Sequence, residues 1–267
     1  MMLKVEDLCI KIHDKNSTET VVKDVDFTMK RGDILGIVGE SGSGKTMSAL
    51  AIAGLLSRHN MEKSGNIIFE DINLLNCSRK VLRKIQGSEI SMIFQEPLNS
   101  LNPIKKIGWQ VEEGLKIHTT MERLERKERA LNALKDVELD NPEAVYNSYP
   151  HELSGGMRQR VMIASAMIVS PKLLIADEPT TALDVTIQAQ IVELLKKINK
   201  ERGTAILFIS HDLSLVNTLC ENVLVMKDGL VVESGKCADI FDNPREAYTK
   251  GLIEAIPHNP FYDGKVI

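Results

Sequence analysis

The sequence predicts an α/β fold in which a mainly parallel sheet is flanked by helices. Short apolar segments alternate with helical patterns in both halves of the chain, a succession typical of such folds. One apolar segment, residues 34–38, leads into a glycine-rich loop and then into a helix rich in small residues and leucine. The 267 residues suffice for one sizeable core, or for a core with a subdomain. An aromatic content of only 4% indicates that this core is aliphatic.

The N-terminal part is expected to hold several strands and one helix. Residues 3–12 alternate loosely, and residues 21–29 alternate apolar with polar side chains, so both segments are predicted to be strands. Residues 31–33 form a turn signal before the fully apolar segment. The remaining elements expected here are a strand at 34–38, a helix at 46–56 and a strand at 65–69.

The character of the sequence changes in its middle part. Residues 121–137 are strongly charged, with Leu124, Leu131, Leu134 and Val137 at roughly helical intervals, which predicts an amphipathic surface helix. Acidic residues balance basic ones there, which argues against a nucleic-acid surface. We therefore expect a helical insert over residues 88–157.

The core pattern then resumes. Residues 1–87 and 158–235 are predicted to form the core, and 236–267 a tail with little core-forming power. Apolar runs on either side of Lys227-Asp228-Gly229 predict a hairpin within residues 223–232. The other elements expected are helices at 157–170 and 186–202 and strands at 173–176 and 205–209.

Charge and hydropathy exclude some classes of protein. The net charge of −4 and pI near 5.9 argue against broad electrostatic attachment to nucleic acid or anionic lipid. The first 30 residues show no secretory signal, and the best apolar run, residues 161–169, is far shorter than the ~18 residues of a spanning helix. Cys9, Cys77, Cys220 and Cys237 lack metal-binding spacing, so we expect a reducing cytosol, with Cys9 and Cys220 as small buried residues.

The glycine-rich loop fits the pattern GxxxxGK[ST] of phosphate-binding loops. Its glycines allow a tight turn that aims backbone N–H groups at phosphate oxygens, and the following helix adds its positive end. The lysine would approach the β- and γ-phosphates and the threonine would offer its hydroxyl to Mg²⁺. The strand–loop–helix context predicts that a nucleoside triphosphate is bound by Gly39, Glu40, Ser41, Gly42, Ser43, Gly44, Lys45 and Thr46.

Two acidic residues follow the apolar segment 173–176. Asp177 is expected to help hold Mg²⁺ through water, and Glu178 to position or deprotonate the attacking water. The alternative is that they merely end a strand. A glutamate at position 178, rather than a glutamine, predicts hydrolysis and not only binding.

His211 follows the expected strand 205–209 and would lie at the same sheet edge as Glu178, where it could sense the γ-phosphate. Ser154, Gly155 and Gly156 form a small-residue segment before a helix, and such a backbone nest suits a γ-phosphate. The alternatives are a structural histidine and an ordinary loop. The other histidines, except His13, default to surface or packing roles.

With these motifs the chain resembles the ATPase subunits of ABC transporters over about residues 1–255. Five motifs stand in the order of that family: the phosphate-binding loop, Gln95 as the Q-loop, 153–157 as the signature, Asp184 in the D-loop and His211 as the switch histidine. The resemblance implies a P-loop NTPase, RecA-like core with a mainly parallel sheet, a small antiparallel β part and an inserted α-helical signature subdomain at 88–157.

The resemblance also assigns roles to residues. Catalysis is expected from Glu178, His211, Lys45 and Gln95, and Mg²⁺ ligation from Thr46, Gln95 and Asp177. Gln95 would also contact ATP and link the site to a membrane partner, and His13 is a possible substitute for the aromatic residue that often stacks on adenine. In a dimer, ATP bound to one subunit would also be contacted by residues of the other subunit, namely Ser154, Gly155, Gly156 and Asp184. A surface glutamine and a helix-capping aspartate are the alternatives for Gln95 and Asp184.

The implied partners are a second ATPase subunit, identical or paralogous, and two transmembrane permease subunits. An extracytoplasmic substrate-binding protein would act indirectly, and no nucleic acid is expected. Such a protein would lie peripherally on the cytoplasmic face of the cell membrane.

Within the family, residues 94–103, 149–160 and 243–249 look like those of dipeptide, oligopeptide and nickel importers. Met157 stands where the general signature has glutamine, which is usual in this subfamily. The C-terminal cysteine cluster common in peptide-importer subunits is not seen, which leaves nickel or metal-chelate import open beside peptide import. The rival classes are a soluble ABC ATPase acting on DNA or the ribosome, a small-molecule kinase, and a module that binds ATP without hydrolysing it.

Overall fold

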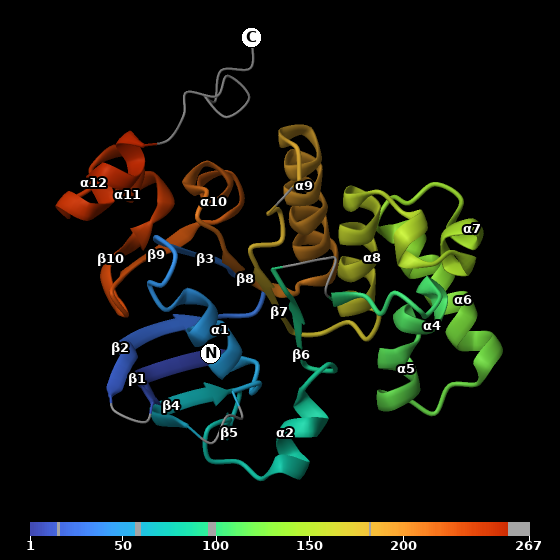
Figure 1. The fold of residues 1–267 in the computed structure, drawn as a ribbon, viewed down its shortest axis with the longest axis horizontal. Coiled ribbons are helices and arrows are strands. Elements are labelled where there is room, and N and C mark those ends of the chain that lie inside the picture. The colour runs from blue at the N-terminus through green and yellow to red at the C-terminus, as the bar shows by residue number, and fades with distance from the viewer. Residues whose placement is uncertain (15–16, 57–59, 96–99, 182, 256–267) are drawn as a thin grey trace. The chain divides into compact units, whose positions relative to one another are not determined.

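The structure is a computed structural model that describes residues 1–14, 17–56, 60–95, 100–181 and 183–255. It consists of two compact units, one comprising Met1–Cys77 and Ala205–Ile267, the other Ser78–Thr204. Each unit combines strands and helices (Figure 1), which confirms the predicted α/β class. Among the residues described, no helix is both long and apolar enough to span a membrane.

The first unit contains the small antiparallel sheet, in the strand order β2-β1-β4-β5. Buried apolar side chains of β1, such as Leu3, Val5 and Ile10, alternate with more exposed ones, so one face of the sheet is the packed face. The register of β1 slips beside Asp7, whose φ of 48° marks a bulge. The strands are β1 (Leu3–His13), β2 (Thr18–Met29), β4 (Met61–Phe69) and β5 (Ile72–Asn73).

The first unit also contributes strands in the order β10-β9-β3-β8. β3 lies parallel to both β8 and β9, and β10 returns antiparallel to β9 across Asp228-Gly229, both with positive φ, so the predicted hairpin is confirmed. β3 and β8 are almost entirely buried, as expected for continuous apolar strands in a parallel sheet. The bounds are β3 (Ile34–Val38), β8 (Ala205–Ile209), β9 (Asn222–Lys227) and β10 (Leu230–Lys236).

Four helices belong to the described part of this unit: α1 (Lys45–Ile52), α10 (Leu213–Leu219), α11 (Cys237–Asp242) and α12 (Ala247–Glu254). Gly36 lets α10 approach β3, because a Cβ there would lie 2.5 Å from a methyl carbon of Val216. The expected C-terminal tail differs from the structure. Its described part forms α11 and α12 and buries Cys237, Ile240 and Thr249, so it adds to the core of the first unit.

The second unit contains the parallel strands β6 (Ile90–Ile93) and β7 (Leu173–Asp177), with Ile93 opposite Ala176. Helices α4, α5, α6 and α7 lie between β6 and α8 in the sequence and appear as a group in Figure 1. The boundaries 88–157 of the helical insert stay a prediction. The helices are α2 (Arg79–Ile85), α4 (Ile107–Val111), α5 (Glu113–His118), α6 (Arg123–Asp136), α7 (Pro142–Asn147), α8 (Gly155–Met167) and α9 (Val185–Arg202), with a 3₁₀ turn at Pro150–Glu152.

The amphipathic helix α6 is present, although its buried face is shorter than the sequence pattern suggested. Ala130, Ala133 and Leu134 are buried, whereas Leu124 in its first turn is 82% exposed. A buried arginine, Arg160 of α8, anchors this region by donating to the backbone oxygen of Val137 at 2.7 Å.

The cysteines form no disulfide within the described residues. Cys220 and Cys237 are buried, whereas Cys9 and Cys77 are half-buried. The expectation of a buried Cys9 is therefore met only in part.

Candidate functional site

The glycine-rich loop leaves β3 at Gly39 and enters α1 at Lys45. Gly39 has a φ of 149°, and a Cβ there would lie 2.1 Å from the backbone oxygen of Met226, so only glycine fits against β9. Gly42 and Gly44 have φ values of 83° and 97°, in the left-handed region that favours glycine. The sequence pattern thus produces the tight turn that a phosphate-binding loop requires.

Lys45 lies inside this loop, with only 5% of its surface exposed. Its Nζ donates hydrogen bonds to the backbone oxygens of Gly39 and Glu40, both at 2.8 Å, and to Oγ of Ser43 at 3.4 Å. A buried ammonium needs such partners, and oxygens of a phosphate would suit it equally. Thr46 follows in the first turn of α1 and is half-buried, while Ser41 and Gly42 are exposed at the outside of the loop.

His211 emerges at the same sheet edge as the loop. β3 and β8 are parallel with Ile37 opposite Ile209, so the residues that follow each strand leave the sheet on the same side. His211 itself is exposed, in a tight turn where Oγ of Ser210 accepts a hydrogen bond from the backbone N of Asp212 at 2.9 Å. The role of His211 toward a γ-phosphate, and its predicted position beside Glu178, stay predictions.

His13 lies at the end of β1 and is exposed. Its Nδ1 is 3.0 Å from Oγ1 of Thr18, and its Nε2 is 3.2 Å from Oε2 of Glu62. Because both ring nitrogens have partners, the face of the ring is the part suited to contact a base. Adenine stacking by His13 stays a prediction.

Glu178 and Gln95 are brought together in the second unit. β6 and β7 are parallel with Ile93 opposite Ala176. Gln95 and Glu178, each two positions further along, therefore leave the strands side by side. Nε2 of Gln95 donates to Oε2 of Glu178 at 2.8 Å, and Oγ1 of Thr181 donates to the same oxygen at 3.0 Å. These two donors fix the orientation of the carboxylate.

The backbone of Glu178 has a φ of 47°, which is uncommon for a residue with a side chain. Such a conformation costs about 1–3 kcal/mol and is found disproportionately at active sites. Glu178 is half-buried and directly follows Asp177, which is only 2% exposed. The predicted roles of Asp177 toward a hydrated metal ion and of Glu178 toward an attacking water stay predictions.

Ser154 begins α8 as its N-cap, with its Oγ accepting a hydrogen bond from the backbone N of Met157 at 3.3 Å. Ser154 and Gly155 are exposed, and Gly156 lies close to α9, where an added Cβ would be 3.0 Å from a methyl carbon of Ile187. The segment therefore presents a helix start to the outside of the second unit. That is the geometry a γ-phosphate from another subunit would need.

Asp184 caps a helix, which is the alternative to its expected contact across a dimer. Its Oδ1 accepts from the backbone N of Ile187 at 3.0 Å, which starts α9. Its side chain is nonetheless exposed, so the contact across a dimer stays a prediction. Ala182 of the same loop, and residues 96–99 after Gln95, lie outside the described residues.

Two residues of this site had no role in the sequence analysis. Thr181, which holds Glu178, could have been suspected because it follows the two acidic residues by only a few positions. Tyr248 of α12 touches the phosphate-binding loop, since its hydroxyl oxygen accepts from the backbone N of Glu40 at 3.0 Å. It lies within the segment 243–249 that resembles peptide importers, yet nothing in the sequence indicates what it contacts.

Comparison with protein families gives two matches along the chain. The model for ABC transporters matches residues 22–181. The model for the C-terminal region of oligopeptide/dipeptide transporters matches residues 232–265. Together they cover the loop, the acidic pair, the signature segment and the α11–α12 region.

Curated relatives match almost the whole chain. The dipeptide transport ATP-binding protein DppD of Haemophilus influenzae is 45% identical over 264 residues, covering 99% of this chain and 79% of the relative. The oligopeptide transport ATP-binding protein OppD of Salmonella typhimurium is 46% identical over 257 residues, covering 96% of this chain and 76% of the relative.

Solved structures with the same fold are ATP-binding cassettes. The dimeric ATP-binding cassette MJ0796, bound to ADP and Pi in a post-hydrolysis state, is 31% identical and covers 88% of this chain and 99% of its own, with a TM-score of 0.79. The cbiO1 protein of Clostridium perfringens, part of an ABC transporter complex, is 32% identical over 91% of each chain, with a TM-score of 0.77. The chain therefore belongs to the ABC transporter family and is an ATPase.

Proposed function

We propose that the chain powers the uptake of dipeptides or oligopeptides, as the ATPase subunit of an ABC importer. The observation that carries this proposal is the match of residues 232–265 to the C-terminal region of oligopeptide/dipeptide transporters, because the rest of the chain resembles ABC ATPases in general. The relatives compared above are named for dipeptide and oligopeptide transport. Peptides are thus favoured over the nickel or metal chelates that the sequence left open.

The contacts of the site residues support the following roles. The loop would bind the triphosphate through its N–H groups, with Lys45 exchanging backbone oxygens for phosphate oxygens. Glu178, oriented by Gln95 and Thr181, would accept the proton of the attacking water. His211, at the edge where the loop emerges, would contact the γ-phosphate.

Mg²⁺ would be held by Thr46, Asp177 and Gln95. Hydroxyl, carboxylate and amide oxygens are the donors that this ion prefers, and it usually retains several waters. The nitrogen of the Gln95 amide faces Glu178, so its oxygen is the atom that would ligate the ion. When bound, Mg²⁺ would neutralise charge that develops on the phosphate oxygens.

Two copies of the chain, or this chain and a paralogue, would enclose ATP between them. The solved MJ0796 cassettes are dimers. In this chain Ser154 and Gly155 are exposed, as residues must be if they complete another subunit's site. Asp184 is exposed as well and would contact the partner while it caps α9.

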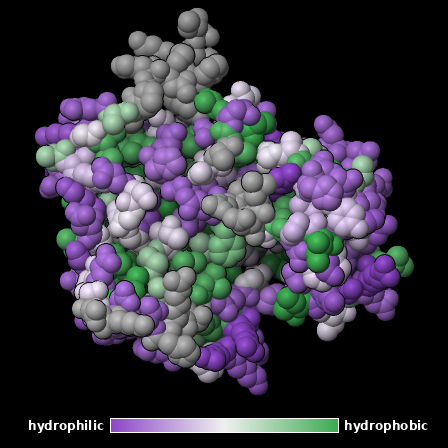
Figure 2. Space-filling model, viewed as in Figure 1, coloured by the Kyte–Doolittle hydropathy of each residue, from purple (hydrophilic) through white to green (hydrophobic). Residues whose placement is uncertain are grey.

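The permease subunits would dock on the second unit. Its described surface exposes large apolar side chains, and Figure 2 shows apolar residues on the face of its helices. These residues are Ile104 (77% exposed), Trp109 (44%), Ile117 (67%) and Leu124 (82%). The chain would thereby be held peripherally at the cytoplasmic face of the cell membrane, with an extracytoplasmic binding protein acting on the other side and no nucleic acid involved.

The proposal is tested by purifying a tagged Glu178→Gln chain from native membranes in mild detergent with ATP, followed by mass spectrometry. Two multispan permease subunits should be recovered, and the ligand extracted from an accompanying binding protein should be a short peptide. A nickel chelate as that ligand would reject the substrate. Recovery of ribosomal or DNA-associated proteins without a membrane protein would reject the transport function.

A further inference from the structure

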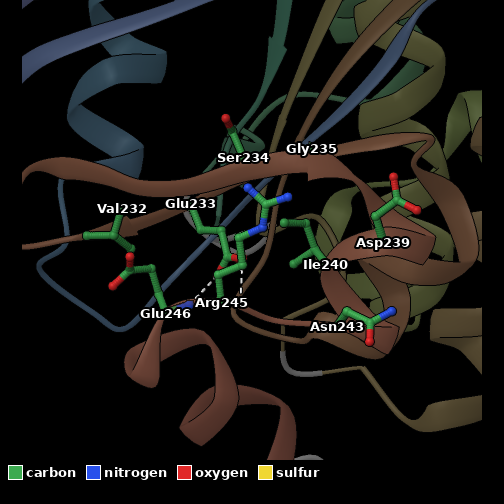
Figure 3. Close-up of a pocket in the computed structure, with 9 residues that line it drawn as sticks. All are labelled: Val232, Glu233, Ser234, Gly235, Asp239, Ile240, Asn243, Arg245 and Glu246. Carbon is green, nitrogen blue, oxygen red and sulfur yellow. Dashed lines mark hydrogen bonds between the residues drawn. The ribbon is translucent and has the colours of Figure 1, made fainter.

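The start of α12 is anchored to β10 by a buried carboxylate. Glu233 of β10 is 9% exposed and accepts hydrogen bonds from the backbone N of Arg245 at 2.8 Å and of Glu246 at 3.2 Å (Figure 3). Burial acts to raise the pKa of Glu233, but the hydrogen bonds to its charged form outweigh burial and hold the pKa below 4.5. A single carboxylate of β10 therefore sets where α12 begins.

A cavity of about 570 Å³ lies beside this anchor. It is bordered by β10, α11 and the segment that leads into α12, including Asp239, Ile240 and Asn243 (Figure 3). The hydrogen bonds that Glu233 accepts from the backbone N of Arg245 and of Glu246 hold the start of α12 beside this cavity.

From this position α12 reaches the phosphate-binding loop. Tyr248, the second residue of α12, accepts the hydrogen bond from the backbone N of Glu40 at 3.0 Å. Nζ of Lys227, at the end of β9, lies 4.9 Å from the centre of the Tyr248 ring, within the range of a cation–π contact. The tyrosine is therefore held between β9 and the loop.

The peptide group that Tyr248 contacts is also the one that holds Lys45. The N–H of Glu40 and the C=O of Gly39 belong to the same peptide bond, and that C=O accepts from Nζ of Lys45 at 2.8 Å. A rotation of this peptide would break both hydrogen bonds and move the ammonium that is to meet the phosphates. The helix and the catalytic lysine are thus joined through one rigid planar group.

We infer that α12 braces the phosphate-binding loop and that Tyr248 is a positioning residue for ATP binding, acting through the Gly39–Glu40 peptide. This inference rests on the proposed role of the loop in binding ATP. It assigns a task to a described part of the region that matches the C-terminal region of peptide transporters. Without the tyrosine hydroxyl, the loop would spend more time in orientations that do not bind phosphate, and affinity would fall.

The experiment is a titration of the full chain with a fluorescent ATP analogue in the presence of Mg²⁺. Tyr248→Phe, which removes only the hydroxyl, should raise Kd about 3- to 10-fold, the effect expected for one hydrogen bond. The matched control is Tyr146→Phe, since the hydroxyl of that tyrosine is bonded to Glu112 within the second unit. It should leave Kd unchanged.

A double-mutant cycle separates positioning from a general loss of stability. Glu233→Gln loosens the start of α12 and should also raise Kd, but its effect should largely disappear in the Tyr248→Phe background, because both act through the same contact. Additive effects, or an unchanged Kd for Tyr248→Phe, would reject the brace. ATP binding by the unaltered chain should be abolished by Lys45→Met. If the unaltered chain does not bind ATP, or if Lys45→Met still binds it, the proposed role of the loop is rejected instead.

Discussion

The side-chain amide of Gln95 donates a hydrogen bond to the carboxylate of Glu178 at 2.8 Å, although 83 residues separate them in the sequence. Thr181 donates to the same carboxylate oxygen at 3.0 Å. A carboxylate held by two donors keeps one orientation, which a general base requires. A displacement of Gln95 would therefore change the orientation of the Glu178 carboxylate.

Replacement of Glu178 by glutamine should slow ATP hydrolysis at least ~10²-fold while ATP is still bound, because an amide cannot accept the proton of water. Phosphate release and nucleotide titration measure the two quantities separately. The control is Glu193→Gln, which should retain activity. Glu193 is exposed on α9, and its carboxylate is paired only with Lys196 in the described structure. Normal turnover in the Glu178 variant would contradict the assignment.

Ser154→Arg should leave ATP binding largely intact while preventing nucleotide-dependent dimerisation, because a long cation would occupy the place of the partner's phosphate. Light scattering with ATP, in a Glu178→Gln background that retains nucleotide, measures the dimer. Loss of the α8 cap costs about 1 kcal/mol in its own right, so a second capping serine provides the control. Ser78→Arg removes the N-cap of α2 and should still permit dimers; equal dimerisation by both variants would reject the composite site.

The cysteines should differ sharply in reactivity toward a thiol reagent at pH 8. Burial raises the pKa of Cys237 to about 11, and burial together with the nearby Cys237 raises that of Cys220 well above its usual value. At pH 8 only about one Cys237 thiol in a thousand would be ionised, and the thiolate is the reactive form. Native protein should therefore be labelled at the half-buried Cys9 and Cys77, and urea should expose the other two. Fast labelling of Cys220 in the native protein would contradict the packing of α10.

Glu233→Gln should lower the free energy of unfolding by about 1–2 kcal/mol at pH 7, because the hydrogen bonds from α12 to a charged carboxylate are replaced by weaker ones. The folded protein holds the pKa of Glu233 below its usual 4.5, so the carboxylate stabilises the fold above pH 4.5. That contribution is lost as the pH falls through the lower, folded-state value. Urea unfolding measures the free energy of unfolding of the variant and of the unaltered chain at pH 7 and below pH 4.5. The difference between the two free energies should be smaller at the acidic pH. A constant difference would reject the ionised anchor.

The local elements of this protein were readable from its sequence. The strands at 34–38 and 205–209 have the predicted bounds because each is a continuous apolar run between polar turns. The loop geometry was equally local, since Gly39, Gly42 and Gly44 adopt the positive φ values that only glycine tolerates well. Leu124 was misread, because helical spacing identifies a face of a helix without showing how far along it the packing extends.

The sequence by itself determined the fold class, the phosphate-binding loop and the family, because these depend on residue types at fixed short spacings. Only the tertiary structure decided which distant residues meet: Gln95 with Glu178, and Tyr248 with Glu40 across 208 residues. The C-terminal region shows the difference most clearly, since its sequence suggested a tail and its described part forms α11 and α12, with the start of α12 held by Glu233. Contacts between distant segments depend on strand register and helix packing, and no local pattern in the sequence specifies these.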